Sequence, residues 1–187
     1  MNHQELILEL SSRYCEPHRH YHTLDHIEYM LMMAGDQDLS DEQVLAIWFH
    51  DAIYEPQSST HEADSADLAV EMLTARRYPK AGIELVRQIV IDSEEHAPTV
   101  PESALVIDLD LSPLAAAPDV YDRNRDNLRR EHAWLSDSEF EGNLRQFLAK
   151  MLAKPHIFWT PWGRQLEAAA RGNLQRALDS LGPPEGP

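Results

Sequence analysis

Apolar side chains recur at helical spacing along most of the chain. Within residues 3–14, for example, Leu6, Leu10 and Tyr14 fall on one face of a helix. The same period continues in the segments 23–34, 40–50, 60–76, 81–95, 118–135, 137–153 and 163–181. No segment shows the sustained alternation of apolar and polar residues that a half-buried strand requires. The pattern therefore predicts an all-α fold.

Local signals indicate where these helices begin and how the chain is organised. Ser40 with Gln43 three positions later forms a capping-box sequence, and prolines occupy most of the gaps between segments. A length of 187 residues suits one domain with a sizeable core. We expect a single compact helical domain over residues 1–181 and a flexible C-terminal tail over residues 182–187, GPPEGP.

Composition narrows the class of protein. The apolar runs, such as VLAIWF at 44–49, are too short to cross a membrane, and the N-terminus lacks the pattern of a secretory signal. The single cysteine, Cys15, excludes an internal disulfide and suits a reducing compartment, so we expect a cytoplasmic protein. Acidic residues outnumber basic ones 32 to 16, which disfavours a surface that binds duplex nucleic acid. An anionic substrate would need a local positive centre, which a divalent cation supplies.

Three short stretches carry candidate metal ligands. In HYHTLDHI, His22 and His26 are four residues apart and would share one face of a helix, either as two ligands or as one ligand beside a proton donor. His50 and Asp51 follow the apolar run at 44–49, so both could face one ion where a buried helix ends. The alternatives are histidines on a solvated helix end, and a C-terminal histidine beside a turn-forming aspartate.

The third stretch, ALVIDLDLS at 104–112, places two carboxylates directly after an apolar run. If this segment is helical, Asp108 and Asp110 point about 200° apart, so only one can reach a shared site. The other would cap or orient neighbouring groups. The segment could instead form a turn, in which Asp and Ser are common.

In their order, His26, then His50-Asp51, then Asp110, these residues resemble the H…HD…D signature of the HD-domain superfamily of metal-dependent phosphohydrolases. The stretch YHTLDH is similar to the Tyr-His-x3-His segment of cyclic nucleotide phosphodiesterases, in which the second histidine binds metal and the first donates a proton. Asp110-Leu111-Ser112 resembles the segment that carries their last metal aspartate. The resemblance therefore assigns Asp110 to the ion, and it implies a helical HD-domain or phosphodiesterase-like fold.

A closer resemblance links nearly the whole chain to a family of uncharacterised bacterial proteins described as predicted HD-type phosphohydrolases. The shared motifs are YHTLDHI, AIWFHDAIY, Glu62–Ala66, DLDLS, Arg130-Glu131 and ARGNL at 170–174. Two positions depart from that family's pattern. His61 stands where the family usually has Asn, and Ser93-Glu94-Glu95-His96 replaces a T-x2-H element.

The resemblance implies hydrolysis of a phosphate ester of a small, nucleotide-like molecule. A divalent ion (Mn, Fe, Co, Ni, Zn or Mg) held by the metal ligands His26, His50, Asp51 and Asp110 would keep about two positions open for water and substrate, and would lower the pKa of the bound water. Asp110 thereby counts among the catalytic residues. His22 is the candidate acid for the leaving oxygen, since an imidazole titrates near neutral pH.

Three further residues are candidates with open alternatives. Glu62 could hold a water or support a ligand, or it could be an exposed helix carboxylate. Arg19 could clamp the substrate phosphate through its guanidinium, or it could form a surface ion pair. His96 could bind substrate, ligate a second metal, or simply end its helix.

The expected partner is a small phosphorylated substrate, with no duplex nucleic acid and no membrane; the oligomeric state, a homodimer included, stays open. Two other functions compete with hydrolysis. One is a di-iron oxygenase of the same superfamily, with His96 and His61 or His132 as extra ligands. The other is a non-catalytic module that binds metal or nucleotide.

Overall fold

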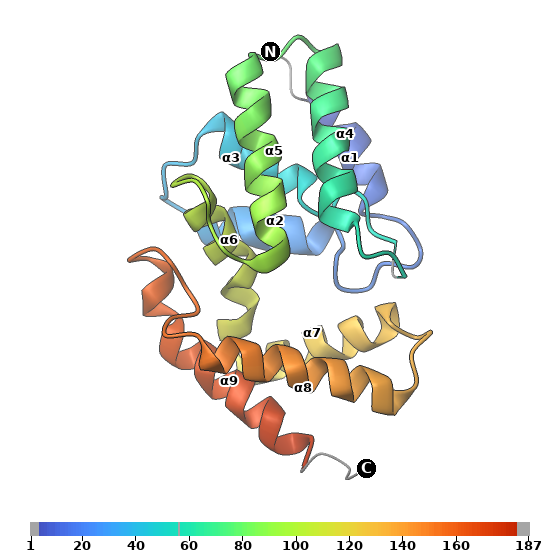
Figure 1. Ribbon diagram of the computed structural model, residues 1–187, viewed down its shortest axis with the longest axis vertical. Helices are drawn as coiled ribbons and strands as arrows, with labels where there is room; N and C mark the ends of the chain where they lie inside the picture. The colour runs from blue at the N-terminus through green and yellow to red at the C-terminus, as the bar shows by residue number, and fades with distance from the viewer. Residues whose placement is uncertain (1–3, 56, 183–187) are drawn as a thin grey trace. The chain divides into compact units, whose positions relative to one another are not determined.

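The computed structural model describes residues 4–55 and 57–182, and within these ranges every regular element is a helix (Figure 1). The prediction of an all-α fold is confirmed. The chain divides into two compact units, residues 1–110 and 111–187. A single domain over residues 1–181 stays a prediction, and residues 183–187 of the expected tail lie outside the described residues.

The first unit is built around one short, almost entirely buried helix. Its helices are α1 (Gln4–Arg13), α2 (Leu24–Ala34), α3 (Asp41–Phe49), α4 (His61–Ala75), α5 (Lys80–Glu95) and most of α6 (Ser103–Leu111). Helix α3 contacts α1, α2, α4 and α5. Leu45, Ile47 and Phe49 are buried on different sides of it, as expected for a helix that is apolar all round. The C-terminal end of α3, with its C-cap His50, therefore lies in the interior of this unit.

Helix boundaries in the first unit follow local chemistry. Ser40 accepts a hydrogen bond from the Gln43 backbone N–H, and the Gln43 side chain accepts one from the Ser40 backbone N–H, so the predicted capping box is confirmed. Helix α2 begins at Leu24 because Thr23, with φ −106° and ψ 178°, is extended and acts as N-cap. The segment with the paired aspartates is helical, which decides between the two options left open by the sequence.

The second unit contains η1 (Ser112–Ala115), α7 (Pro118–Glu131), α8 (Asp137–Ala153), η2 (Gly163–Gln165) and α9 (Glu167–Ser180). The motif ARGNL lies on α9 and has a structural explanation. Arg171 donates to the carbonyls of Leu152 and Lys154 at the end of α8. The buried Asn173 donates to the carbonyls of Leu114 and Ala116. Two side chains of one helix thus satisfy the backbone ends of its neighbours.

Within the described ranges, no helix combines the length and the apolar character needed to span a bilayer.

Candidate metal centre

The centre of the first unit brings together the ends of three helices. His26 lies in the first turn of α2, His50 caps the end of α3, and Asp110 lies near the end of α6. Nε2 of the buried His26 is 3.1 Å from Oδ1 of Asp110, although 84 residues separate them. The resemblance to the HD pattern predicted this meeting, and the packing of the helices produces it.

His50 is oriented as a ligand. Its Nδ1 lies 2.8 Å from the carbonyl oxygen of Ile47, one turn earlier, and a carbonyl can only accept. Nδ1 therefore carries the proton in the neutral ring, and Nε2 presents a lone pair. Nε2 is buried and has no hydrogen-bond partner among the described residues, yet it lies 2.9 Å from Asp51 Oδ2 and 3.7 Å from Asp110 Oδ1. When the ring is neutral, the lone pairs of His50 Nε2, Asp51 Oδ2 and Asp110 Oδ1 thus face one another.

Such spacing suits a shared cation. Two ligand atoms about 2.1 Å from one ion and at right angles to each other are about 3 Å apart. One ligand atom from each of His26, His50 and Asp51 lies within 4.8 Å of the others, so this group could hold a metal ion. Asp110 adds a fourth ligand atom, its Oδ1, within 4 Å of both histidine nitrogens. The chain therefore supplies two imidazoles and two carboxylates, a set that fits a divalent transition metal or Mg²⁺.

The helical form of residues 103–111 separates the two aspartates as the sequence predicted. Asp110 reaches the centre, whereas Asp108 is fully buried elsewhere in the helix packing. The assignment of Asp110, not Asp108, to the centre is thus consistent with the geometry.

The protonation states reflect the crowding of opposite charges. Burial disfavours the charged form of His50, but the carboxylates of Asp51 and Asp110 outweigh it and raise the pKa of His50 to about 9. Burial opposes ionisation of Asp51 as well, and the charges of His50 and His22 reverse this and lower its pKa. For Asp110, hydrogen bonds with His26 and His96 outweigh burial and hold the pKa well below 3.8. In the metal-free protein a proton thus provides the positive charge that the carboxylates require.

His22 reaches the centre in a way the sequence did not predict. The expectation of a shared helix face with His26 is wrong, because α2 begins only at Leu24 and His22 lies in the turn before the Thr23 N-cap. The turn still places the two rings 6.1 Å apart, edge to face. Nε2 of His22 is 3.9 Å from Asp51 Oδ2, and its side chain is 19% exposed. His22 therefore stands between the carboxylate and solvent, as a proton donor requires.

Arg19 does not fit the predicted role of phosphate clamp. Its side chain is completely buried, and its nitrogens donate to the Glu16 carboxylate and to the carbonyls of His22, Asp51 and Ala52. The guanidinium carbon also lies 5.1 Å from the ring centroid of Tyr14 and 5.4 Å from that of Tyr54. Arg19 instead ties the turn that carries His22 to the backbone of the His50-Asp51 segment.

The remaining predicted residues surround the centre. His96 ends α5 in a left-handed conformation (φ 49°, ψ 47°), and its Nε2 is 3.4 Å from Asp110 Oδ2. His61 begins α4, its ring stacks on Tyr54 with centroids 5.0 Å apart, and its Nδ1 accepts from the Glu55 backbone N–H. Glu62 is half-buried in the first turn of α4, and no hydrogen bond or ion pair joins it to another described residue.

Sequence reasoning missed the residues that position His96 and Asp110. The buried Asp92 accepts hydrogen bonds from the side chains of Gln88, Thr99 and Ser103 and from the Thr99 backbone N–H. These bonds join the last turn of α5 to the first residue of α6. An aspartate inside a predicted amphipathic helix, with Thr and Ser seven and eleven residues later, was the available signal.

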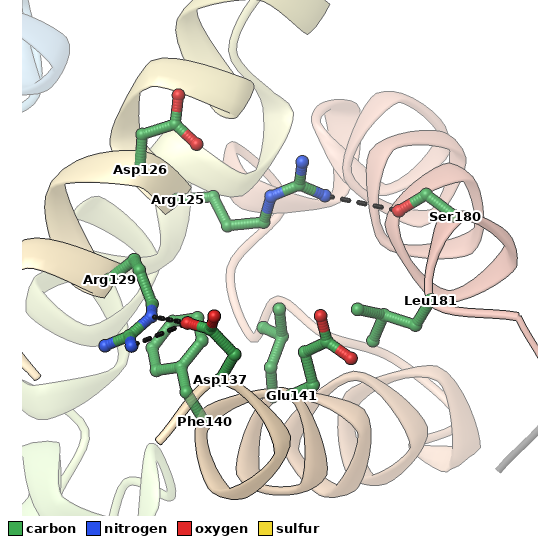
Figure 2. A pocket seen from close by; sticks show the side chains of 9 residues that line it. Arg125, Asp126, Arg129, Asp137, Phe140, Glu141, Ser180 and Leu181 are labelled. Carbon is green, nitrogen blue, oxygen red and sulfur yellow. Dashed lines mark hydrogen bonds and ion pairs between the residues drawn. The ribbon is translucent and has the colours of Figure 1, made fainter. Parts of the chain in front are cut away.

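A separate hollow of about 390 Å³ lies in the second unit, among α7, α8 and α9 (Figure 2). Arg129 pairs with Asp137, and Arg125 donates to Ser180, so both guanidinium groups already have partners. The lining mixes charges of both signs with apolar groups. Its residues are Arg125, Asp126, Arg129, Asp137, Phe140, Glu141, Leu144, Ser180 and Leu181.

Comparison of the chain with protein-family models, with curated proteins and with solved structures found no significant match.

Proposed function

We propose that the protein is a metal-dependent phosphohydrolase, an HD-type enzyme that cleaves a phosphate ester of a small, nucleotide-like substrate. The observation that supports this proposal is the convergence of two buried imidazoles and two carboxylates, in which His50 Nε2 lies 2.9 Å from Asp51 Oδ2 and 3.7 Å from Asp110 Oδ1, and His26 Nε2 lies 3.1 Å from Asp110 Oδ1. Buried carboxylates require a compensating positive charge. In the metal-free protein a proton on His50 provides it, and a divalent cation bound by the same atoms would replace that proton.

The chain's own residues divide the work of hydrolysis. Water attacks phosphorus, the ester P–O bond breaks, and the leaving oxygen needs a proton. His22 can donate that proton from Nε2, since the ring is partly exposed and the nearby Asp51 carboxylate can form an ion pair with the imidazolium. His96, whose Nε2 lies 3.4 Å from Asp110 Oδ2, can donate a hydrogen bond to the phosphate. When bound, a divalent cation lowers the pKa of a coordinated water and offsets charge on the phosphate.

Metal binding and turnover of simple phosphoesters test the proposal. Protein loaded with Mn²⁺, Co²⁺, Ni²⁺ or Mg²⁺ should hydrolyse p-nitrophenyl esters or members of a nucleotide panel. Asp51→Ala should abolish both turnover and tight metal binding, whereas Glu71→Gln, an exposed carboxylate ten residues from His61 along α4, should leave both unchanged. If no loaded form of the protein turns over any phosphoester, the proposal is wrong.

A second experiment isolates the role of His22. His22→Gln should keep metal affinity and lower kcat about 100-fold or more for an ester with a poor, alkoxide-like leaving group. The loss should be much smaller for p-nitrophenolate, which leaves without a proton. His20→Gln, two positions away and exposed, is the matched control. Equal losses for both leaving groups would rule out acid catalysis by His22.

One observation favours a second candidate function, oxygen activation by two iron ions. His96 Nε2 lies 3.4 Å from Asp110 Oδ2, while Oδ1 of the same carboxylate faces His26, so Asp110 could bridge two ions. Binding of two iron ions per chain, with optical changes that depend on oxygen, would support this function. A non-catalytic module would bind nucleotide and metal tightly without turnover.

A further inference from the structure

The net negative charge of the protein is confined to the unit that holds the candidate metal centre. Residues 1–110 contain 22 acidic and 6 basic residues, whereas residues 111–187 contain 10 of each. The formal charge of −16 therefore belongs entirely to the first unit. Such a field attracts divalent cations and repels anions, and the repulsion grows with the charge of the anion.

The sequence immediately around the centre is acidic as well. Among the charged residues within three positions of the metal ligands, His22, His61 and His96, the only basic one is Arg19. Its guanidinium is buried and donates to Glu16 and to three backbone carbonyls, so it cannot neutralise a substrate. The acidic ones are Asp25, Glu28, Glu62, Asp64, Glu94, Glu95 and Asp108.

Two of the other cations of this unit lie far along the helices. Lys80 begins α5, sixteen residues before His96, which corresponds to about 24 Å along the helix axis. Arg76 follows the end of α4, about 22 Å from His61, and pairs with Glu9. These distances exceed the screening length of about 8 Å at physiological salt.

At the centre itself the charges cancel. In the described part of the chain, Asp51 and Asp110 form ion pairs only with imidazoles, those of His22, His26, His50 and His96. One divalent cation, two carboxylates and the neutral imidazole ligands sum to zero, and His22 as the proton donor adds one positive charge. A singly charged phosphate is therefore balanced, whereas each additional negative charge on the substrate is disfavoured by the acidic surroundings.

We propose, building on the function proposed above, that the substrate is a singly charged phosphodiester, in preference to a doubly charged phosphomonoester or a polyphosphate. In this reaction one water adds to phosphorus and one ester oxygen leaves with a proton. The products are a phosphomonoester and an alcohol. Because the monoester gains charge, the same field that disfavours it as substrate favours its release as product.

Two substrates of nearly equal size separate charge from shape. Methyl p-nitrophenyl phosphate carries one negative charge at pH 8, and p-nitrophenyl phosphate carries two, with the same leaving group. We expect kcat/KM of the metal-loaded protein to be about tenfold or more higher for the diester. From 20 to 500 mM NaCl, kcat/KM should rise for both substrates and more steeply for the monoester, since salt screens repulsion. Preference for the monoester, or a fall with salt, would overturn the proposal.

Charge-neutralising variants provide the matched test. The double variant Glu94→Gln/Glu95→Gln removes two charges beside His96, and it should raise kcat/KM for the monoester about threefold more than for the diester. The variant Glu71→Gln/Glu84→Gln removes two exposed charges about 15–18 Å along the helices from His61 and His96 and should change neither. Equal effects of the two variants would contradict a local origin of the selectivity.

Binding without turnover gives an independent readout. ³¹P NMR titrations of the Mg²⁺-loaded protein should show tighter binding of dimethyl phosphate than of methyl phosphate, and tighter-binding methyl phosphate would overturn the proposal. The two proposals fail differently in these experiments. If the protein binds metal and cleaves only monoesters, the charge selectivity is wrong and hydrolysis stands; if it cleaves neither ester, hydrolysis itself is wrong.

Discussion

Replacing Asp92 by Asn should destabilise the first unit and weaken its candidate metal centre. Oδ1 of Asp92 accepts from Gln88 at 2.7 Å and from the Thr99 hydroxyl at 2.8 Å. Oδ2 accepts from the Thr99 backbone N–H at 2.7 Å and from the Ser103 hydroxyl at 2.6 Å. Asn keeps one oxygen and turns the other into a donor, so two of the four donors lose their acceptor.

The magnitude follows from the charge and the burial of this carboxylate. A hydrogen bond to a charged group contributes about 1.5–3 kcal/mol. Losing two, with partial rescue by rotation of the hydroxyls, should lower the free energy of unfolding by about 3 kcal/mol. Asp92 is only 4% exposed, so water cannot replace the lost bonds. Metal affinity should fall too, because Ser103 anchors the helix that carries Asp110.

Urea denaturation monitored by circular dichroism measures the loss. Asp67→Asn, on the exposed side of α4, is the control and should change stability by less than about 0.5 kcal/mol. A loss below about 1 kcal/mol in Asp92→Asn would refute the inferred strength of the cluster.

The pH dependence checks the same cluster. Burial alone would raise the pKa of Asp92, but the bonds from Ser103, Thr99 and Gln88 outweigh it and lower the pKa below 3.8. A carboxyl whose folded pKa is depressed contributes stability above its unfolded pKa and loses it as pH falls through the folded pKa. The difference between wild type and Asp92→Asn should therefore be constant above about pH 5 and shrink below pH 3.8.

Two further substitutions, one in each unit, test side chains that donate hydrogen bonds to backbone carbonyls of neighbouring segments. Arg19→Met leaves the Asp51 and Ala52 carbonyls without their donor, so it should lower the free energy of unfolding by about 3–5 kcal/mol and weaken metal binding. Arg87→Met, at a half-buried position of α5, is the control and should cost far less. A metal affinity measured by calorimetry that is unchanged in Arg19→Met would contradict its positioning role. Asn173→Ala removes the two N–H donors that bind the Leu114 and Ala116 carbonyls, and it should lower the free energy of unfolding, measured by thermal denaturation, by about 1–3 kcal/mol. Exposed Gln175→Ala is the control, and equal losses in the two variants would refute the prediction.

Local patterns in the sequence were sufficient for most helices and for one cap. Helices over residues 4–13, 24–34 and 137–153 lie close to their predicted ranges, because apolar periodicity and capping depend on residues only three or four positions apart. Such reasoning fails where apolar residues keep helical spacing although the helix itself ends or is interrupted. The predicted segment 118–135 ends at Glu131, and the segment 163–181 divides at Leu166 into a 3-10 turn and α9.

The candidate ligands could be named from their order along the chain, and the side of the helix that carries Asp110 followed once that helix was established. What the sequence could not supply is the set of contacts that crosses the unit. The buried guanidinium of Arg19 depends on carbonyls 32 and 33 residues away, and the bond from Ser103 to Asp92 joins two different helices. The place of His22 depends on where α2 begins, which apolar periodicity did not locate.

Helix type and candidate chemistry were thus determined by the sequence alone, since each rests on side chains that are neighbours along one helix or on an ordered motif. The tertiary structure decided which of those side chains converge, which donate to backbone carbonyls instead, and that the candidate metal centre lies in the acidic unit formed by residues 1–110. The physical reason is that burial and charge act through space, and only packing brings Nε2 of His26 and Nε2 of His50 within 4 Å of Asp110 Oδ1.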